Sequence, residues 1–481
     1  MKKKKLSPKF QNFNKIFLLT IDSVNSKEFN KENFPNLFKL KKNMYQFRKY
    51  FVHAAPTQQS FQSFFSMKPP MADGGYDFGL DKKTTFLNRL KKKKYHLSSF
   101  QGSVFFSNFY NYPQNFDIYK LTINPYYIAS TFQKHFLAKL DEFYPDKKIS
   151  NKKYVKEMKF VLDKFFLNVN KCLKSNYLIC YPAFSKHFFK KRFVRIFEEY
   201  SRDKDIFILK NSKNLLFFSY FIPFGGFLKY LPNKMKEIID FFLKKNFLLT
   251  QLQPPENDFS NKVLEFVTQK KIKFKKKIFF WSHFLDPHDS IGNTNNFCKK
   301  KKIIFKNSKK RYHISLKSID KTIFSLINKI SQIKQFNNST FIITSDHGPN
   351  FDEKIHITKN FKNDITHVPL FIYNKKLQPK IINTTYQNSD FYLILSQFLE
   401  KKNFVNKKNF LYFENKGKGY SKFNNENIYL RIKNKNYDTV SEVLYKKNKI
   451  IFLNKKIEKF FSNKELLGYK KSILKYFNET K

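Results

Sequence analysis

Cysteine is scarce in this chain, and the few cysteines present exclude two common frameworks. Among 481 residues only Cys172, Cys180 and Cys298 are cysteines. Their number is odd and their spacing matches no zinc-binding pattern, so we expect neither a disulfide-stapled fold nor a cysteine metal site. Free thiols are typical of a reducing compartment, and we therefore predict a cytoplasmic location.

Long apolar runs are also missing. The basic start of the chain is followed by a single apolar run, Ile16 to Ile21, which Asp22 ends. That run is shorter than the apolar core of a secretory signal. No segment approaches the roughly 20 apolar residues of a membrane-spanning helix, so we predict no transmembrane segment.

Arginine is rare although the formal net charge is +56. Proteins that grip nucleic-acid phosphates usually include arginine for its bidentate fork, whereas here almost all of the positive charge is lysine. Lysine, phenylalanine, asparagine and isoleucine are enriched together along the whole length, as AT-rich coding produces. We therefore expect no specific nucleic-acid partner, although the positive field should attract anionic substrates. A nucleic-acid-binding protein that uses this charge stays open as an alternative, and steeply salt-dependent affinity would reveal it.

Apolar residues are abundant enough for a large core, since they make up 41% of the chain and include 62 phenylalanines. Apolar strands alternate with helical patterns over residues 15–102 and again from 261, which predicts an α/β class with a mostly parallel, mixed central sheet between helical layers. Residues 1–110 and 258–400 are expected to form one catalytic domain. Residues 111–257 read as a helical insertion, and residues 401–481 as a small C-terminal α+β subdomain.

Two apolar strands end in metal-type ligands. The run Phe341 to Ser345 leads directly into Asp346 and His347, with Gly348 behind them, and the run that begins at Ile16 ends at Asp22. Open α/β sheets place their chemistry at the carboxyl ends of strands. The pattern indicates a metal site, although an aspartate at a strand end can equally be a turn residue or a helix cap.

Thr57 and His288 are the candidate reactive groups. Thr57 follows a predicted strand and precedes a helix, where a hydroxyl lies at an anion-binding position and ionises more easily beside a cation. An ordinary helix cap is the alternative for this threonine. His288 lies just beyond another apolar strand and suits an anionic substrate. His283 lies inside that strand, and we expect it to be a core histidine.

Together these segments resemble the sulfatase branch of the alkaline phosphatase superfamily. The resemblance covers most of the chain from about residue 15 to residue 370. It is carried by five motifs in order: Leu19-Thr20-Ile21-Asp22-Ser23, Phe34-Pro35-Asn36-Leu37, Ala55-Pro56-Thr57-Gln58-Gln59-Ser60-Phe61-Gln62-Ser63, Phe284-Leu285-Asp286-Pro287-His288 and Ser345-Asp346-His347-Gly348.

The resemblance implies an alkaline phosphatase-like fold and a role for each matching position. Thr57 would be the nucleophile and a metal ligand, and the other metal ligands would be Asp22, Asp346 and His347. The substrate anion would be contacted by four residues: Ser60, His288, His356 and Lys359. The metal would be a divalent ion, with Zn or Mn favoured by the imidazole and Ca or Mg as alternatives.

The departures from the sulfatase pattern favour phosphorus over sulfur. Sulfatases carry a cysteine or serine that is oxidised to an aldehyde, and Thr57 cannot be converted in this way. Ser23 stands where a second metal-binding aspartate is expected. The remaining residues look like the single-metal site of threonine-dependent phosphotransferases, because a phosphothreonine can be displaced by water or an alcohol. We predict a hydrolase, phosphodiesterase or phosphotransferase acting on phosphate or sulfate esters of a glycan or a lipid-head-group-like alcohol. A true sulfatase and an inactive binding protein of the same fold remain alternatives.

Overall fold

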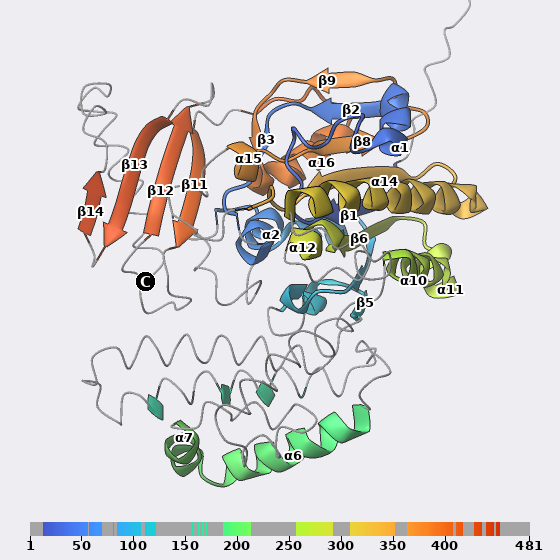
Figure 1. Ribbon diagram of the computed structural model, residues 1–481. Helices are drawn as coiled ribbons and strands as arrows, with labels where there is room; N and C mark the ends of the chain where they lie inside the picture. Colours follow the sequence, from blue (N-terminus) through green and yellow to red (C-terminus); the bar gives the residue numbers. More distant parts are fainter. Residues whose placement is uncertain are drawn as a thin grey trace, which may run out of the picture.

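The computed structural model describes residues 13–55, 57–69, 80, 84–106, 111–121, 155–156, 159, 162–163, 166–167, 170, 186–212, 256–291, 308–351, 363–406, 410–416, 428–434, 439–446 and 449–452. At its centre lies an eight-stranded sheet with the order β5-β4-β6-β1-β7-β8-β2-β9 (Figure 1). The bounds of these strands, in chain order, are β1 (Lys15–Ile21), β2 (Met44–Phe47), β4 (His96–Gln101), β5 (Ile118–Leu121), β6 (Ile278–Phe284), β7 (Thr340–Ser345), β8 (Leu370–Tyr373) and β9 (Lys380–Ile382).

Strand direction confirms the predicted α/β class. Strand β1 pairs in parallel with β6 on one side and with β7 on the other. Strand β4 continues the parallel arrangement from β6 to β5. Only β8 runs antiparallel to its neighbours, β7 and β2, while β9 is again parallel to β2. The sheet is therefore mixed and mostly parallel.

Alternate residues of the central strand point to opposite layers, as the two-residue period of a strand requires. From β1, Ile16 and Leu18 pack into one apolar cluster, and Phe17 and Leu19 pack into the other. Because β1 is buried on both faces, its sequence is a continuous apolar run rather than an alternating one. Two cores with a sheet between them make the three-layer α/β/α arrangement.

The helices divide between the two layers. The side of Phe17 is covered by α1 (Pro35–Phe38), α10 (Glu256–Thr268) and the long α14 (Ser308–Gln332). The side of Leu18 is covered by α2 (Thr57–Ser66), α3 (Phe86–Lys92) and α16 (Phe391–Leu399). Shorter elements are α11 (Lys270–Lys273), α12 (Asp286–Ile291), α15 (Asn363–Thr366), and the paired strands β3 (Tyr50–Phe51) and β10 (Tyr386–Gln387).

The structure differs from the sequence reading in one segment of the sheet. We expected helices from residue 111 onward, yet β5 pairs with β4 as a further parallel strand. Its buried side chains, Tyr119 and Leu121, alternate with two less buried ones, which is the period of a strand. Four residues are too short a window for that period to be distinguished from a helical one.

Further helices and a second sheet lie outside the main sheet. Helices α6 (Lys186–Arg202) and α7 (Lys204–Ser212) lie in the predicted insertion. Toward the C-terminus, an antiparallel sheet is formed by β11 (Phe410–Lys416), β12 (Ile428–Asn434), β13 (Thr439–Lys446) and β14 (Lys449–Phe452). Phe413 of β11 meets the ring of Phe51 edge-on. Within the described ranges, no helix combines the length and apolar character needed to cross a membrane. The domain boundaries at residues 110, 257 and 400 stay predictions.

Candidate metal centre

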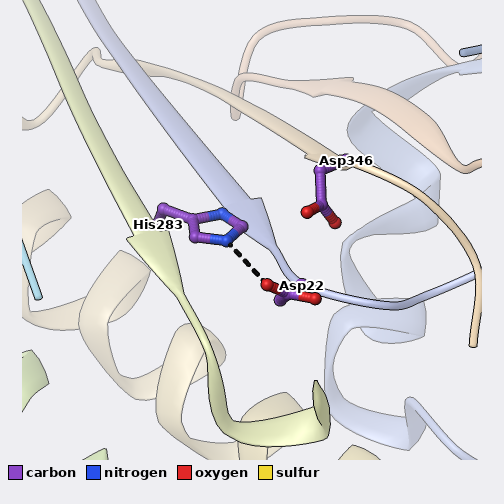
Figure 2. Close-up of side chains that lie close together, drawn as sticks. All are labelled: Asp22, His283 and Asp346. Atoms are coloured by element: carbon purple, nitrogen blue, oxygen red, sulfur yellow. Dashed lines mark hydrogen bonds and ion pairs between the residues drawn. The ribbon is translucent and has the colours of Figure 1, made fainter. Parts of the chain in front are cut away.

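The carboxyl ends of three adjacent strands bring Asp22, His283 and Asp346 together. Asp22 follows β1, Asp346 follows β7, and His283 lies in β6 near its carboxyl end. One ligand atom from each of the three lies within 4.8 Å of the other two, and all three residues are buried. Figure 2 shows the Asp346 carboxylate turned toward Asp22 and the His283 ring. Residues separated by more than 300 positions thus share one small space.

Asp346 has one satisfied oxygen and one unsatisfied oxygen. Its Oδ1 accepts the backbone N–H groups of Ser23 at 3.1 Å and His347 at 2.8 Å. Its Oδ2 is buried and accepts no hydrogen bond from the described residues. His347 Nε2 lies 3.4 Å from that atom. A buried carboxylate oxygen without a donor is costly, and a bound cation removes the cost, so the site fits a metal.

His347 presents one ring nitrogen to this centre. Its Nδ1 lies 2.8 Å from the carbonyl oxygen of Gly348, which can only accept, so Nδ1 carries the proton. The unprotonated Nε2 then faces Asp346 Oδ2 and lies 3.8 Å from Asp22 Oδ1. A carbonyl that fixes the tautomer in this way is the usual support of a histidine that binds metal.

Thr57 reaches the same centre from the other side. The sequence placed Thr57 just before a helix, and in the structure Thr57 is the first residue of α2, with its side chain buried. Its hydroxyl lies 3.4 Å from Asp22 Oδ2 and 3.2 Å from His347 Nε2. The structure therefore brings together all four residues expected to hold the metal: Asp22, Thr57, Asp346 and His347.

Histidines dominate the electrostatics at Asp22. Burial alone would raise the pKa of the Asp22 carboxyl, but the surrounding imidazoles, His288 first and then His283 and His347, hold that pKa well below its usual range. The carboxyl is thus kept as a carboxylate, the form that binds cations. His288 itself lies on α12, immediately after β6, and is exposed.

The remaining predicted contacts have different outcomes. The Ser60 hydroxyl donates to the backbone oxygen of Asp346 at 2.6 Å, and the side chain of Asn388 donates to both oxygens of Ser60. Ser60 therefore ties α2 to the end of β7, and its contact with substrate stays a prediction. His356 and Lys359 lie outside the described residues, so their contacts also stay predictions.

Sequence reasoning placed His283 in the core and missed its contact with the centre. The ring is fully buried, as expected for a core residue, yet its Nε2 lies 3.2 Å from Asp22 Oδ2. The register of the two parallel strands could have predicted this contact. Thr20 is level with His283, and Asp22 lies two residues beyond Thr20 on the same face of the sheet, so Asp22 lies beside the His283 ring. Reading that register requires knowing that β1 and β6 are neighbours.

Comparison with known protein families supports the resemblance to sulfatases that the sequence motifs indicated. Residues 230–401 match the Sulfatase family model, and this span includes His283, Asp346 and His347. Over these residues the chain is similar to the sulfatase family. The recognition made from the motifs is confirmed by this match, and so is the coarse expectation of a sulfatase-family ester hydrolase or transferase. A search among curated proteins found no match.

Solved structures similar to this chain share little sequence with it. A protein of the alkaline phosphatase superfamily from Vibrio parahaemolyticus has a TM-score of 0.48 and 12% identity, over 98% of this chain and 86% of that one. The lipoteichoic acid synthase LtaP from Listeria monocytogenes has a TM-score of 0.47 and 11% identity, over 97% and 94%. The C-terminal periplasmic domain of EcEptC from Escherichia coli, in complex with Zn, has a TM-score of 0.43 and 10% identity, over 81% and 84%. The family assignment rests on the sequence match of residues 230–401.

Proposed function

We propose that this chain is a divalent-metal-dependent enzyme that cleaves phosphate esters through a covalent intermediate on Thr57. The observation that carries the proposal is the position of the Thr57 hydroxyl. It lies at the first residue of α2, within 3.4 Å of both Asp22 and His347. A helix N-terminus stabilises negative charge, so this hydroxyl is placed where an alkoxide and an incoming phosphate are both favoured.

The donor set suits one metal ion. Asp22, Thr57, Asp346 and His347 would hold it, and oxygen donors with an imidazole favour Zn or Mn, with Ca or Mg as alternatives. When bound, such an ion neutralises the ester oxygens and lowers the pKa of a coordinated hydroxyl. The structure of EcEptC in complex with Zn is consistent with zinc as the first metal to test.

The chemistry of Thr57 favours phosphorus. In the first step its Oγ1 attacks phosphorus, the bond from phosphorus to the ester oxygen breaks, and the alcohol leaves. The hydroxyl proton would pass to solvent, because Asp22 and His347, the two side chains nearest the hydroxyl, would themselves hold the metal. His288, which is exposed on α12, is proposed to protonate the departing alcohol. In the second step water or another alcohol attacks the phosphothreonine and frees Thr57. A threonine sulfate lacks the aldehyde-assisted exit of sulfatases.

The substrate is proposed to be a phosphate ester of a glycan or a lipid-head-group-like alcohol. His356 and Lys359 are proposed to bind the ester anion beside Ser60 and His288. A cytoplasmic location also stays our prediction from the sequence. Water as the acceptor in the second step gives hydrolysis, and an alcohol as the acceptor gives transfer.

The test compares the wild type with Thr57→Ala and Thr57→Ser. Each protein is stripped of metal, reloaded with Zn, Mn, Mg or Ca, and assayed on chromogenic phosphate diester, phosphate monoester and sulfate ester. We expect diester turnover that requires metal, falls by several powers of ten in Thr57→Ala and largely survives in Thr57→Ser. Mass spectrometry after brief incubation should find a phosphoryl group on the Thr57 peptide of the wild type.

Two alternatives predict different results from the same assay. A true sulfatase would turn over the sulfate ester without diester activity, and this would overturn the preference for phosphorus. A binding protein of the sulfatase family would turn over none of the three esters with any metal. Full diester activity in Thr57→Ala would remove Thr57 as the nucleophile while leaving the metal requirement intact.

A further inference from the structure

Three residues on one face of the sheet form a chain of contacts that ends at Asp22. Thr20 of β1 is level with His283 of β6 in the parallel ladder. Trp281 lies two residues before His283, and its side chain therefore emerges on the same face. All three side chains are fully buried. The chain runs from Trp281 through Thr20 to His283 and then to the carboxylate.

Hydrogen-bond chemistry constrains the proton positions in this chain. The indole nitrogen of Trp281 can only donate, and it lies 3.1 Å from Thr20 Oγ1. The Thr20 hydroxyl in turn donates to the backbone oxygen of Ser282 at 3.3 Å. The remaining partner of Thr20 Oγ1 is His283 Nδ1, at 2.9 Å. When the Thr20 proton is directed to Ser282, Oγ1 accepts from His283 and Nδ1 carries the ring proton.

Packing holds the His283 ring in that orientation. The rings of Phe61 from α2 and Phe106 each meet the imidazole nearly at right angles, with centroids 4.9 Å and 5.2 Å away. A ring held this way cannot turn to exchange its two nitrogens. The second nitrogen, Nε2, is therefore fixed 3.2 Å from Asp22 Oδ2.

We propose that Thr20 is a positioning residue that holds His283 in the tautomer with the proton on Nδ1, and that His283 Nε2 thereby joins Asp22 and Asp346 as a ligand of the metal. With Nδ1 protonated, the lone pair of Nε2 faces a carboxylate oxygen. Two acceptors at this distance repel each other unless a cation lies between them. The inference rests on the metal centre of the proposed function and adds a ligand and its support to it.

The opposite arrangement has a distinct signature. If Thr20 donated to Nδ1 instead, the proton would sit on Nε2 and point at Asp22. His283 would then be a hydrogen-bond donor to a metal ligand and not a ligand itself. The two arrangements differ in which ring nitrogen carries hydrogen in the metal-loaded protein.

The first test measures zinc affinity, with no need for turnover. Metal-stripped wild type, Thr20→Val and Thr20→Ser are titrated with zinc in competition with a chromophoric chelator. Valine keeps the shape of threonine and removes the oxygen, so we expect affinity to fall on the order of 10–100-fold, as for other residues that support a metal ligand. Serine keeps the oxygen and should restore most of the wild-type affinity.

Thr344→Val is the matched control. Thr344 is level with Thr20 on the next strand, is equally buried, and stands two residues before Asp346 as Thr20 stands before Asp22. Its hydroxyl donates to the backbone oxygen of Pro369 at 2.8 Å. Loss of that bond should lower the melting temperature without changing zinc affinity. Equal zinc affinity of wild type and Thr20→Val would overturn the inference and leave the proposed function standing.

The second test locates the proton. In zinc-loaded protein with ¹⁵N-labelled histidine, we expect the His283 resonances, assigned by their loss in His283→Gln, to show hydrogen on Nδ1 and a metal-bound Nε2. Hydrogen on Nε2 would overturn the ligand role of His283. A wild type that binds no divalent metal would remove both this inference and the metal centre of the proposed function.

Discussion

Gly348 shows what the Ser-Asp-His-Gly motif requires of its last residue. A β-carbon built on Gly348 would lie 1.8 Å from the backbone oxygen of Asp364 and 2.9 Å from the β-carbon of Asn25. The N–H of Gly348 also donates to the backbone oxygen of Ile365 at 2.7 Å. The segment around α15 thus packs directly on the backbone of the metal-binding loop. Since Gly348 also accepts the Nδ1–H of His347, its position bears on the tautomer of that ligand.

Gly348→Ala should therefore destabilise the protein strongly. Backbone atoms cannot yield as a flexible side chain does, so we expect a loss of about 3 kcal/mol in the free energy of unfolding. Gly102→Ala is the control, because its new β-carbon would meet only the ring edge of Phe259, at 3.2 Å. We expect that variant to lose about 1 kcal/mol or less. Chemical denaturation of both variants measures the difference, and equal losses would mean that the loop at Gly348 can move.

At the scale of elements, α1 is held by a carboxylate that comes from another helix. The residue before α1, Phe34, supplies no capping side chain. Instead, Asp320 of α14 accepts the N–H of Asn36 at 2.9 Å and the N–H of Leu37 at 2.8 Å, together with the Asn36 side-chain amide at 2.7 Å. The Phe-Pro-Asn-Leu motif therefore provides the N–H groups that bind Asp320 of α14, and these hydrogen bonds hold α1 against α14.

Replacing Asp320 tests this joint. Asp320→Ala would leave buried N–H groups without acceptors, and we expect a loss of about 3 kcal/mol in the free energy of unfolding. Asp320→Asn keeps one acceptor oxygen and should lose less. Burial raises the pKa of the Asp320 carboxyl, and a carboxyl with a raised folded pKa takes up its proton more readily in the folded state. The wild type should thus gain stability relative to Asp320→Asn as the pH falls through that raised pKa. Denaturation curves across acidic pH check the sign.

The elements also show how far sequence could lead. Strands β1 and β7 were predictable because each is an apolar run ended by an aspartate, and parallel strands put such residues at one edge. Helix α2 was predictable from its phenylalanine spacing. The contact of His283 with Asp22 and that of Asp320 with α1 depend on which strands and helices become neighbours across more than 250 residues. No local pattern in the sequence carries that information.

At the scale of the whole molecule, the strong positive charge is compatible with two different functions. The net charge of this chain is +56. A strong positive charge occurs both in nucleic-acid-binding proteins and in chains whose composition is simply rich in lysine. The described site is not built from lysines: its centre consists of two carboxylates, a hydroxyl and imidazoles. The charge therefore bears on how anions reach the site and less on how they react there.

Salt separates these two roles. If the net positive field steers an anionic ester toward the site, kcat/KM should fall as sodium chloride is raised, because the screening length drops from ~30 Å at 0.01 M to ~3 Å at 1 M. The value of kcat should stay nearly constant, since the atoms of Asp22, Thr57 and His347 lie 3.2 to 3.8 Å apart, and salt screens such distances little. Assays with an uncharged triester at the same salt concentrations serve as the control. If kcat/KM for the anionic ester proves independent of salt, the lysines do not steer substrate, and steeply salt-dependent RNA affinity in the same protein would then favour the nucleic-acid alternative.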